Sequence, residues 1–127
     1  MNCRFKHHYT REEVRRLLPQ VEVWLTHVNE ARAEFNKAVL PMQGFHSDGC
    51  DVGGGLTTRY LQSFLQLSQG LKQFSRREIF IKDLDAGVID FPSFAAGREV
   101  FLCWRRGELD VDHWHDLDSD FSGRVRI

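Results

Sequence analysis

The spacing of apolar residues changes once along this chain, close to Phe74. Before that point they recur at helical spacing, and Val14 and Val21 lie one heptad apart on the same side of a helix. After it, short runs of β-branched and aromatic residues are bounded by glycine and proline, as is typical of strands. The sequence therefore predicts an α+β fold. A long antiparallel helical hairpin at about residues 10–75 is followed by a small, mainly antiparallel β-meander at about residues 77–127.

The first helix has a well-marked start. Thr10 can cap it, and Glu13 completes a capping box. A proline removes one helical hydrogen bond and crowds the preceding turn. Pro19 therefore predicts a kink or break near Leu18, and Pro41 predicts the end of the helix.

The second helix is expected from Leu56 to about Phe74, after a glycine-rich linker at residues 41–55. Together the two helices carry more apolar side chains than a hairpin and a small sheet can bury. A homodimer, or a higher symmetric oligomer, would complete a helical bundle. Replacing Leu25 with Asp is expected to dissociate it, because a buried unpaired carboxylate is costly.

Four segments of the last third are expected to be strands: Arg77–Lys82, Val88–Phe91, Val100–Trp104 and about Glu108–His115. The second of them should end at Pro92, which has no N–H for a ladder. A tight turn is expected before the last strand, because Gly107 can adopt a positive φ.

Ionisable side chains gather beside these apolar strands. Such groups are rarely buried without partners, so His115 is expected in a polar pocket. The pocket is either a ligand site or a structural network in which arginines bridge carboxylates. The candidate ligand-binding residues are Asp90, Arg98, Glu99, Trp104, His115 and Arg124.

A metal ion is a second interpretation of the same region. His113 and His115 lie two residues apart, so a strand would point both imidazoles to one face. With Asp116 as an oxygen ligand they could hold a divalent metal ion. Hydrogen-bonded or surface histidines beside a polar turn are the alternative.

Composition excludes several classes of function. The 127 residues are ordinary for a single domain, residues 1–127. A net charge of -1 gives no general attraction to nucleic acid or to a membrane surface. No stretch is apolar enough to cross a bilayer, and the start has no secretory core, so a cytoplasmic protein is expected. Cys3, Cys50 and Cys103 predict reduced thiols, with Cys103 buried as a small hydrophobe.

Several short motifs together resemble one known family, an uncharacterised prokaryotic family called domain of unknown function 2203. They are Lys82-Asp83-Leu84, Gly87-Val88-Ile89-Asp90-Phe91-Pro92, Gly97-Arg98-Glu99-Val100, Leu102-Cys103-Trp104, Gly107-Glu108, Trp114-His115 and Gly123-Arg124, with Glu12-Glu13 and Leu17-Leu18-Pro19 near the start. The resemblance implies a small bacterial protein with a long helical pair and a β-rich carboxy-terminal part, and it brings no established activity. His113 and Asp120 depart from the family pattern, in which an aromatic residue and a glycine are commoner. This favours His115 over His113 as a site residue.

Two functions follow from these observations. The first is a self-associating, non-enzymatic domain with a polar site near His115. The alternative is a metal-binding protein or a metal-assisted enzyme that uses His115 with nearby carboxylates.

Overall fold

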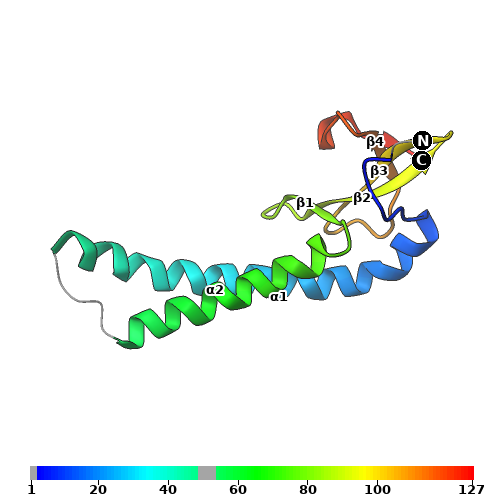
Figure 1. The fold of residues 1–127 in the computed structure, drawn as a ribbon. Coiled ribbons are helices and arrows are strands. Elements are labelled where there is room, and N and C mark those ends of the chain that lie inside the picture. The colour runs from blue at the N-terminus through cyan, green and yellow to red at the C-terminus, as the bar shows by residue number, and fades with distance from the viewer. Residues whose placement is uncertain (1–2, 49–53) are drawn as a thin grey trace. The chain divides into compact units, whose positions relative to one another are not determined.

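A computed structural model describes residues 3–48 and 54–127 (Figure 1). Two helices come first and a five-stranded sheet follows, so the predicted α+β fold is confirmed. The elements are α1 (Arg11–Asp48), α2 (Gly54–Ser75), β1 (Phe80–Asp83), β2 (Val88–Ala95), β3 (Arg98–Arg105), β4 (His113–Asp116), the 3-10 turn η1 (Phe121–Gly123) and β5 (Val125–Arg126). Part of the expected glycine-rich linker, residues 49–53, lies outside the described residues.

Helix α1 begins as the sequence predicts and continues further than expected. The Glu13 N–H donates to Thr10 Oγ1 at 3.1 Å, and the Thr10 N–H donates to Glu13 Oε1 at 3.3 Å, which is a capping box. The helix then continues through Pro19 and Pro41 to Asp48. The expected end at Pro41 is therefore wrong, and of the kink or break expected near Leu18 the break is wrong. Each proline removes only one backbone hydrogen bond, and the remaining ladder carries the helix past it.

The chain folds as two compact units, one comprising Met1–Val23 and Phe74–Ile127 and the other Trp24–Gln73. The second unit, here the hairpin unit, is the predicted antiparallel pair of helices. The Phe35 ring lies 5.4 Å from the Tyr60 ring, whereas Val28, earlier in α1, meets Gly70, later in α2. A Cβ on Gly70 would come within 2.9 Å of Val28 Cγ2, so glycine permits the close approach there.

The other unit, here the sheet unit, holds the meander. Its strands pair in the order β1-β2-β3-β4-β5, each antiparallel to the next. Five strands are present where about four were expected, because the two residues of β5 gave no recognisable pattern. The expected strand at Glu108–His115 is shorter than predicted and begins only at His113.

Strand β2 runs straight through Pro92, where the sequence suggested that it would end. Strand β1 pairs with β2 only as far as Asp90, so at Pro92 one side of β2 is open. On that side the Tyr9 N–H donates to the Pro92 carbonyl at 2.7 Å. The N–H and C=O of a strand residue point to the same side. The N–H that Pro92 lacks would therefore have faced the open side, and no bond to β3 is lost.

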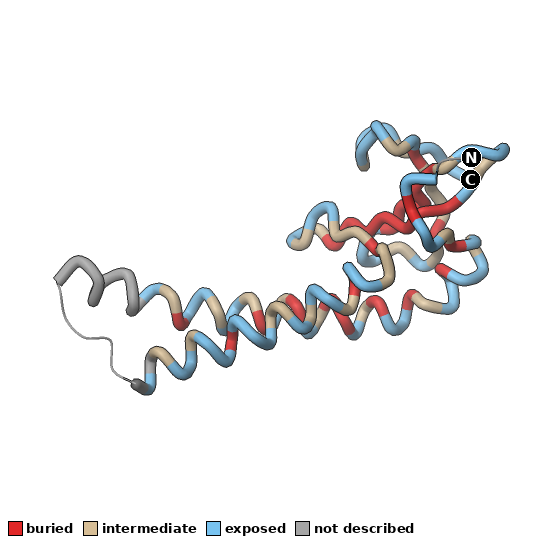
Figure 2. Tube along the Cα trace, in the orientation of Figure 1, coloured by how far each residue is buried: buried red, intermediate tan, exposed pale blue. Residues whose placement is uncertain are grey.

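Much of β2 and β3 is buried (red in Figure 2), and the two faces of the sheet carry different kinds of side chain. One face is apolar, with Ile89 and Trp104 opposite each other, and Tyr9 packs edge-on against Phe91 of this face at 5.7 Å. The opposite face, here the polar face, carries Asp90 and Phe101. Phe5 covers part of the polar face, with its ring 5.4 Å from that of Phe101.

Candidate functional site

Strand register gathers four side chains that could bind a metal, from three strands, on the polar face. Asp90 lies opposite Cys103, and Cys103 lies opposite His113. His115 is two residues from His113 and therefore points to the same face, opposite Phe101. Asp90 and His115 are each 1% exposed, and Cys103 is 0% exposed. We call Asp90, Cys103 and His115 the buried cluster.

Both ring nitrogens of His115 are hydrogen-bonded. Nδ1 lies 2.8 Å from the Asp116 carbonyl oxygen, and Nε2 lies 3.0 Å from Asp90 Oδ2. A carbonyl can only accept, so Nδ1 carries a hydrogen. The bond from Nε2 to Asp90 then holds one proton, either on an imidazolium facing a carboxylate or on a carboxylic acid facing a neutral ring. Both arrangements have the same net charge.

The surroundings oppose ionisation of the other two members of the cluster. Burial raises the pKa of Asp90, although His115 beside it acts in the opposite direction. Burial, together with the Asp90 carboxyl group, raises the pKa of the Cys103 thiol to about 12. A buried, protonated thiol is not a nucleophile. This is consistent with the expectation that Cys103 packs as a small hydrophobe.

Two buried polar atoms near Cys103 lack hydrogen-bond partners. Among the described residues, Asp90 Oδ1 and His113 Nδ1 are the buried side-chain polar atoms in this condition. Their residues are the two that lie opposite Cys103 on the neighbouring strands. Buried polar atoms are normally satisfied. His113 Nδ1 has Glu108 Oε2 as a neighbour at 3.8 Å, so the buried carboxyl group of Asp90, beside the Cys103 thiol, is the place where a further partner would be favourable.

Arg124 and Trp104, two predicted ligand-binding residues, gather around Glu108, and the Arg124 side chain also interacts with that of Cys103. Arg124 forms a bidentate pair with Glu108, at 3.0 and 2.9 Å, and the Trp104 indole N–H donates to the Glu108 carbonyl at 3.0 Å. Burial raises the pKa of Glu108, but hydrogen bonds from Arg124 and from the Arg105 N–H outweigh it and lower the pKa overall. His113 Nδ1 lies 3.8 Å from Glu108 Oε2. Sequence reasoning did not single out Glu108 as a site residue, although Gly107-Glu108 is one of the motifs shared with the family.

Glu99 binds the amino-terminal segment instead of His115. Its carboxylate accepts the Arg4 N–H at 2.6 Å, the Phe5 N–H at 3.0 Å and His8 Nε2 at 2.8 Å. The backbone hydrogen bond from Arg4 is the main reason that the pKa of Glu99 is lowered. Cys3, His8 and Glu99 place ligand atoms within 4.8 Å of one another, which makes a second group of metal-competent side chains.

Arg98 and Asp116 also lie apart from the buried cluster as side chains. They form an exposed ion pair at 3.0 Å. Of the residues that the sequence proposed beside His115, Asp90 is the one whose side chain hydrogen-bonds to it. The ligand or metal role of every predicted site residue stays a prediction.

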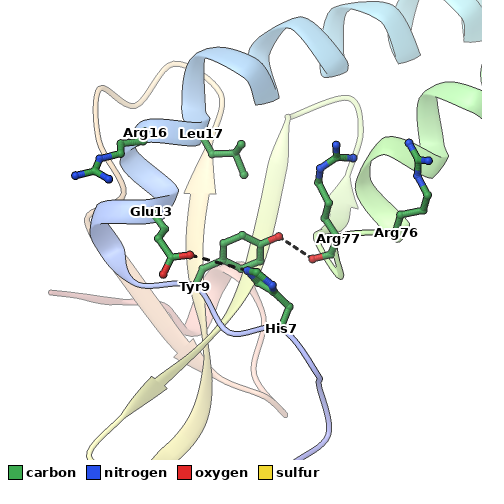
Figure 3. Close-up of a pocket in the computed structure, with 7 residues that line it drawn as sticks. All are labelled: His7, Tyr9, Glu13, Arg16, Leu17, Arg76 and Arg77. Carbon is green, nitrogen blue, oxygen red and sulfur yellow. Dashed lines mark hydrogen bonds and ion pairs between the residues drawn. The ribbon is translucent and has the colours of Figure 1, made fainter.

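Two open grooves lie elsewhere in the sheet unit. One, of about 420 Å³, is lined by His7, Tyr9, Glu13, Arg16, Leu17, Arg76 and Arg77 (Figure 3). Its tyrosine hydroxyl donates to the Arg77 carbonyl at 2.8 Å, and burial raises the pKa of Tyr9 to about 12. The second, of about 440 Å³, has Phe94, Leu102 and Trp114 in its wall. Asp90, Cys103 and His115 line neither groove, so neither gives access to the buried cluster.

Together these features define a small α+β protein with a helical hairpin, a five-stranded antiparallel meander and a hydrogen-bonded Asp–His pair inside the sheet unit. The model of the uncharacterised conserved protein family DUF2203 matches residues 7–127, and the chain belongs to that family. Searches of the curated proteins and of the solved structures found no match. Within residues 3–48 and 54–127, no helix has the length and apolar character needed to span a membrane.

Proposed function

We propose that this protein is a non-enzymatic domain that associates with a second copy of itself through α2. The observation that carries the proposal is a row of apolar side chains on that helix. Its members, here the α2 row, are Leu61, Phe64, Leu65 and Leu71, each between 41% and 56% exposed. Positions 61, 64, 65 and 71 fall on one side of an α-helix. The row lies beside the seam where Tyr60 packs on Phe35.

The absence of charge from this part of α2 supports an interface. Residues 60–71 contain no Asp, Glu, Lys or Arg. The exposed surface of α1 is different, with ion pairs such as Lys37–Glu34 at 3.3 Å and Arg16–Glu12 at 3.4 Å. Interface centres are depleted in charged residues, whereas solvated helix faces are rich in them. The α2 row therefore has the composition of a covered surface.

A second copy fits this surface better than an unrelated partner does. An uncharged apolar row can pair with itself across a two-fold axis without bringing like charges together. Two antiparallel hairpins joined in this way make a four-helix bundle, in which each row becomes part of a common core.

The burial of His115 argues against an enzyme. A catalytic side chain must reach its substrate, and both His115 and Asp90 are almost fully inaccessible. The second candidate function, a metal-binding protein that uses His115, needs no such access. The grouping of a carboxylate, a thiol and an imidazole in the buried cluster favours it.

A pair of variants in α2 tests self-association. Leu65→Asp places a carboxylate in the α2 row, whereas Gln66→Asp adds the same charge at an exposed position on another side of the helix. Sedimentation velocity should show Leu65→Asp as a monomer and Gln66→Asp unchanged, with equal helical content by circular dichroism. Leu25 is unsuitable, because it is 0% exposed within the single chain and its replacement would report on folding. Equal association of both variants would contradict the proposal.

A further inference from the structure

We infer that the buried cluster is a zinc site, in which Asp90, Cys103 and His115 are three protein ligands of a Zn²⁺ ion. This inference is independent of self-association. It adds Cys103, which the sequence indicated only as a packing residue, and it names the class of ion.

The spacing of the ligand atoms suits a tetrahedral ion. The ligand atoms of Asp90, Cys103 and His115 all lie within 4.8 Å of one another, and His115 Nε2 is 3.0 Å from Asp90 Oδ2. With bonds of about 2.0 to 2.3 Å, two ligand atoms of a tetrahedral zinc ion lie roughly 3.3 to 3.8 Å apart. Only small shifts of these three side chains are therefore needed to accommodate an ion.

The ring of His115 is already oriented for ligation through Nε2. Its Nδ1–H donates to the Asp116 carbonyl, which fixes the tautomer and leaves Nε2 directed at Asp90. A histidine that binds a metal through one nitrogen usually donates its other N–H to a carbonyl or carboxylate in this way.

An unsatisfied carboxylate oxygen points to the same place. Asp90 Oδ1 has no hydrogen-bond partner among the described residues, although Asp90 is 1% exposed. The Cys103 thiol lies opposite Asp90 in the pairing of β2 with β3 and interacts with its carboxyl group. A cation between these two side chains would bind the carboxylate and the thiolate together.

The charges balance inside the apolar setting. Without metal, the cluster holds one proton between Asp90 and His115 and one on the Cys103 thiol, with no net charge. Zn²⁺ binding displaces both protons to solvent and leaves a carboxylate, a thiolate and a neutral imidazole around the ion, again with no net charge. Thiolate and imidazole ligands favour Zn²⁺ over Mg²⁺ and Ca²⁺, which prefer oxygen.

The group of Cys3, His8 and Glu99 provides an internal contrast. Its carboxylate already accepts two backbone N–H groups and a histidine, so an ion would have to break existing bonds. That group has no unsatisfied buried oxygen or nitrogen atom among the described residues. A cysteine, a histidine and a carboxylate residue thus make a hydrogen-bonded network around Glu99, whereas the buried cluster leaves one carboxylate oxygen without a hydrogen-bond partner among the described residues.

Cobalt substitution tests the inference. The chain has three cysteines, so Cys3→Ser with Cys50→Ser leaves Cys103 as its one thiol. Co²⁺ or Zn²⁺ is added to this untagged double variant before refolding, because the cluster is closed to solvent in the folded chain. We expect a cobalt–thiolate charge-transfer band and tetrahedral visible bands that saturate at one Co²⁺ per chain. Zn²⁺ should abolish these bands and Mg²⁺ should not.

Ligand variants in the same background sharpen the result. Cys103→Ser should remove the charge-transfer band, and Asp90→Asn and His115→Gln should weaken Co²⁺ binding by at least about tenfold, since even outer-shell changes cost that much. Glu99→Gln should leave the stoichiometry unchanged. If the double variant refolds, by circular dichroism, with no cobalt–thiolate band and no retained zinc, the inference is overturned, whatever the ligand variants do.

Discussion

The hairpin unit and the sheet unit both expose large apolar side chains, but they arrange them differently. In the sheet unit these residues are scattered, with Phe94 near the end of β2, Leu109 in a turn and Val125 in β5. In the hairpin unit the α2 row collects four of them on one side of a single helix. Isolated exposed apolar residues are normal on any protein, whereas contiguous ones mark contact surfaces. The two units differ in how their exposed apolar side chains are arranged more than in how many they have.

The units also differ in where their buried polar groups lie. In the hairpin unit the buried Ser63 hydroxyl donates to the Arg59 carbonyl of the preceding turn, which is a purely local solution. In the sheet unit Asp90 and His115 find each other across strands and leave one carboxylate oxygen unpaired. This contrast is the reason that we propose association for the hairpin unit and ligand binding for the sheet unit.

The largest expected effect comes from two matched phenylalanines. Phe91 is fully buried in β2, so Phe91→Ala should lower the free energy of unfolding by about 3 to 5 kcal/mol. Phe64 is 46% exposed in the α2 row and its ring lies 6.2 Å from that of Phe35. Phe64→Ala should therefore destabilise dilute protein much less than Phe91→Ala does, but it should raise the dissociation constant of the dimer. Urea unfolding and sedimentation equilibrium measure the two effects. Similar losses of stability in both variants would remove the distinction between the units.

The next effect concerns the Asp–His pair. In metal-free protein, Asp90→Ala removes the hydrogen-bond partner of the buried His115 Nε2. The change should lower the free energy of unfolding by roughly 3 kcal/mol. Asp90→Asn should cost less than half of that, because its amide can donate to Nε2 of a neutral ring. Urea unfolding followed by tryptophan fluorescence compares them. Equal and small losses would mean that the pair is solvated, contrary to its burial.

A smaller effect should appear at acidic pH through Glu99. The pKa of Glu99 is lower in the folded chain than in the unfolded one, so its contribution to stability is complete above the ordinary glutamate pKa of about 4.3. That contribution is lost as the pH falls through the lowered pKa. Glu99→Gln should flatten this part of the stability–pH curve and reduce hydrogen-exchange protection of the Arg4 and Phe5 amides. An unchanged acid limb in the variant would show that another carboxylate is responsible.

The smallest expected effect is that of salt on self-association. Residues 60–71 carry no charge, so the dissociation constant should change less than about twofold between low and physiological ionic strength. A steep dependence of the dissociation constant on salt, measured by sedimentation equilibrium, would contradict an interface at the α2 row. It would indicate an interface on a charged surface such as that of α1.

Local signals predicted local structure well. The Thr10–Glu13 capping box forms as its spacing indicated, and Gly107 adopts a φ of 103° in the turn that the sequence marked. Pro92 shows the limit of such signals. Whether a proline ends a strand depends on which side of the strand has a neighbour, and that is a property of the pairing, not of the residue.

The candidate site depended on register, which the sequence could not determine. Alternation placed His113 and His115 on one face, but only the pairing of β2 with β3 brings Asp90 opposite Cys103. Glu99 was a reasonable site residue by type, yet its main partners are backbone N–H groups of Arg4 and Phe5. Backbone donors are present at almost every position, so such a network leaves no trace in the sequence.

The mass of the native chain in solution tests the central claim most directly. Sedimentation equilibrium over a concentration series, at neutral pH and without an affinity tag, should approach twice the 14.8 kDa of one chain as concentration rises. Leu65→Asp should remain at 14.8 kDa over the same range. A native chain that stays at 14.8 kDa at every concentration would contradict self-association through the α2 row.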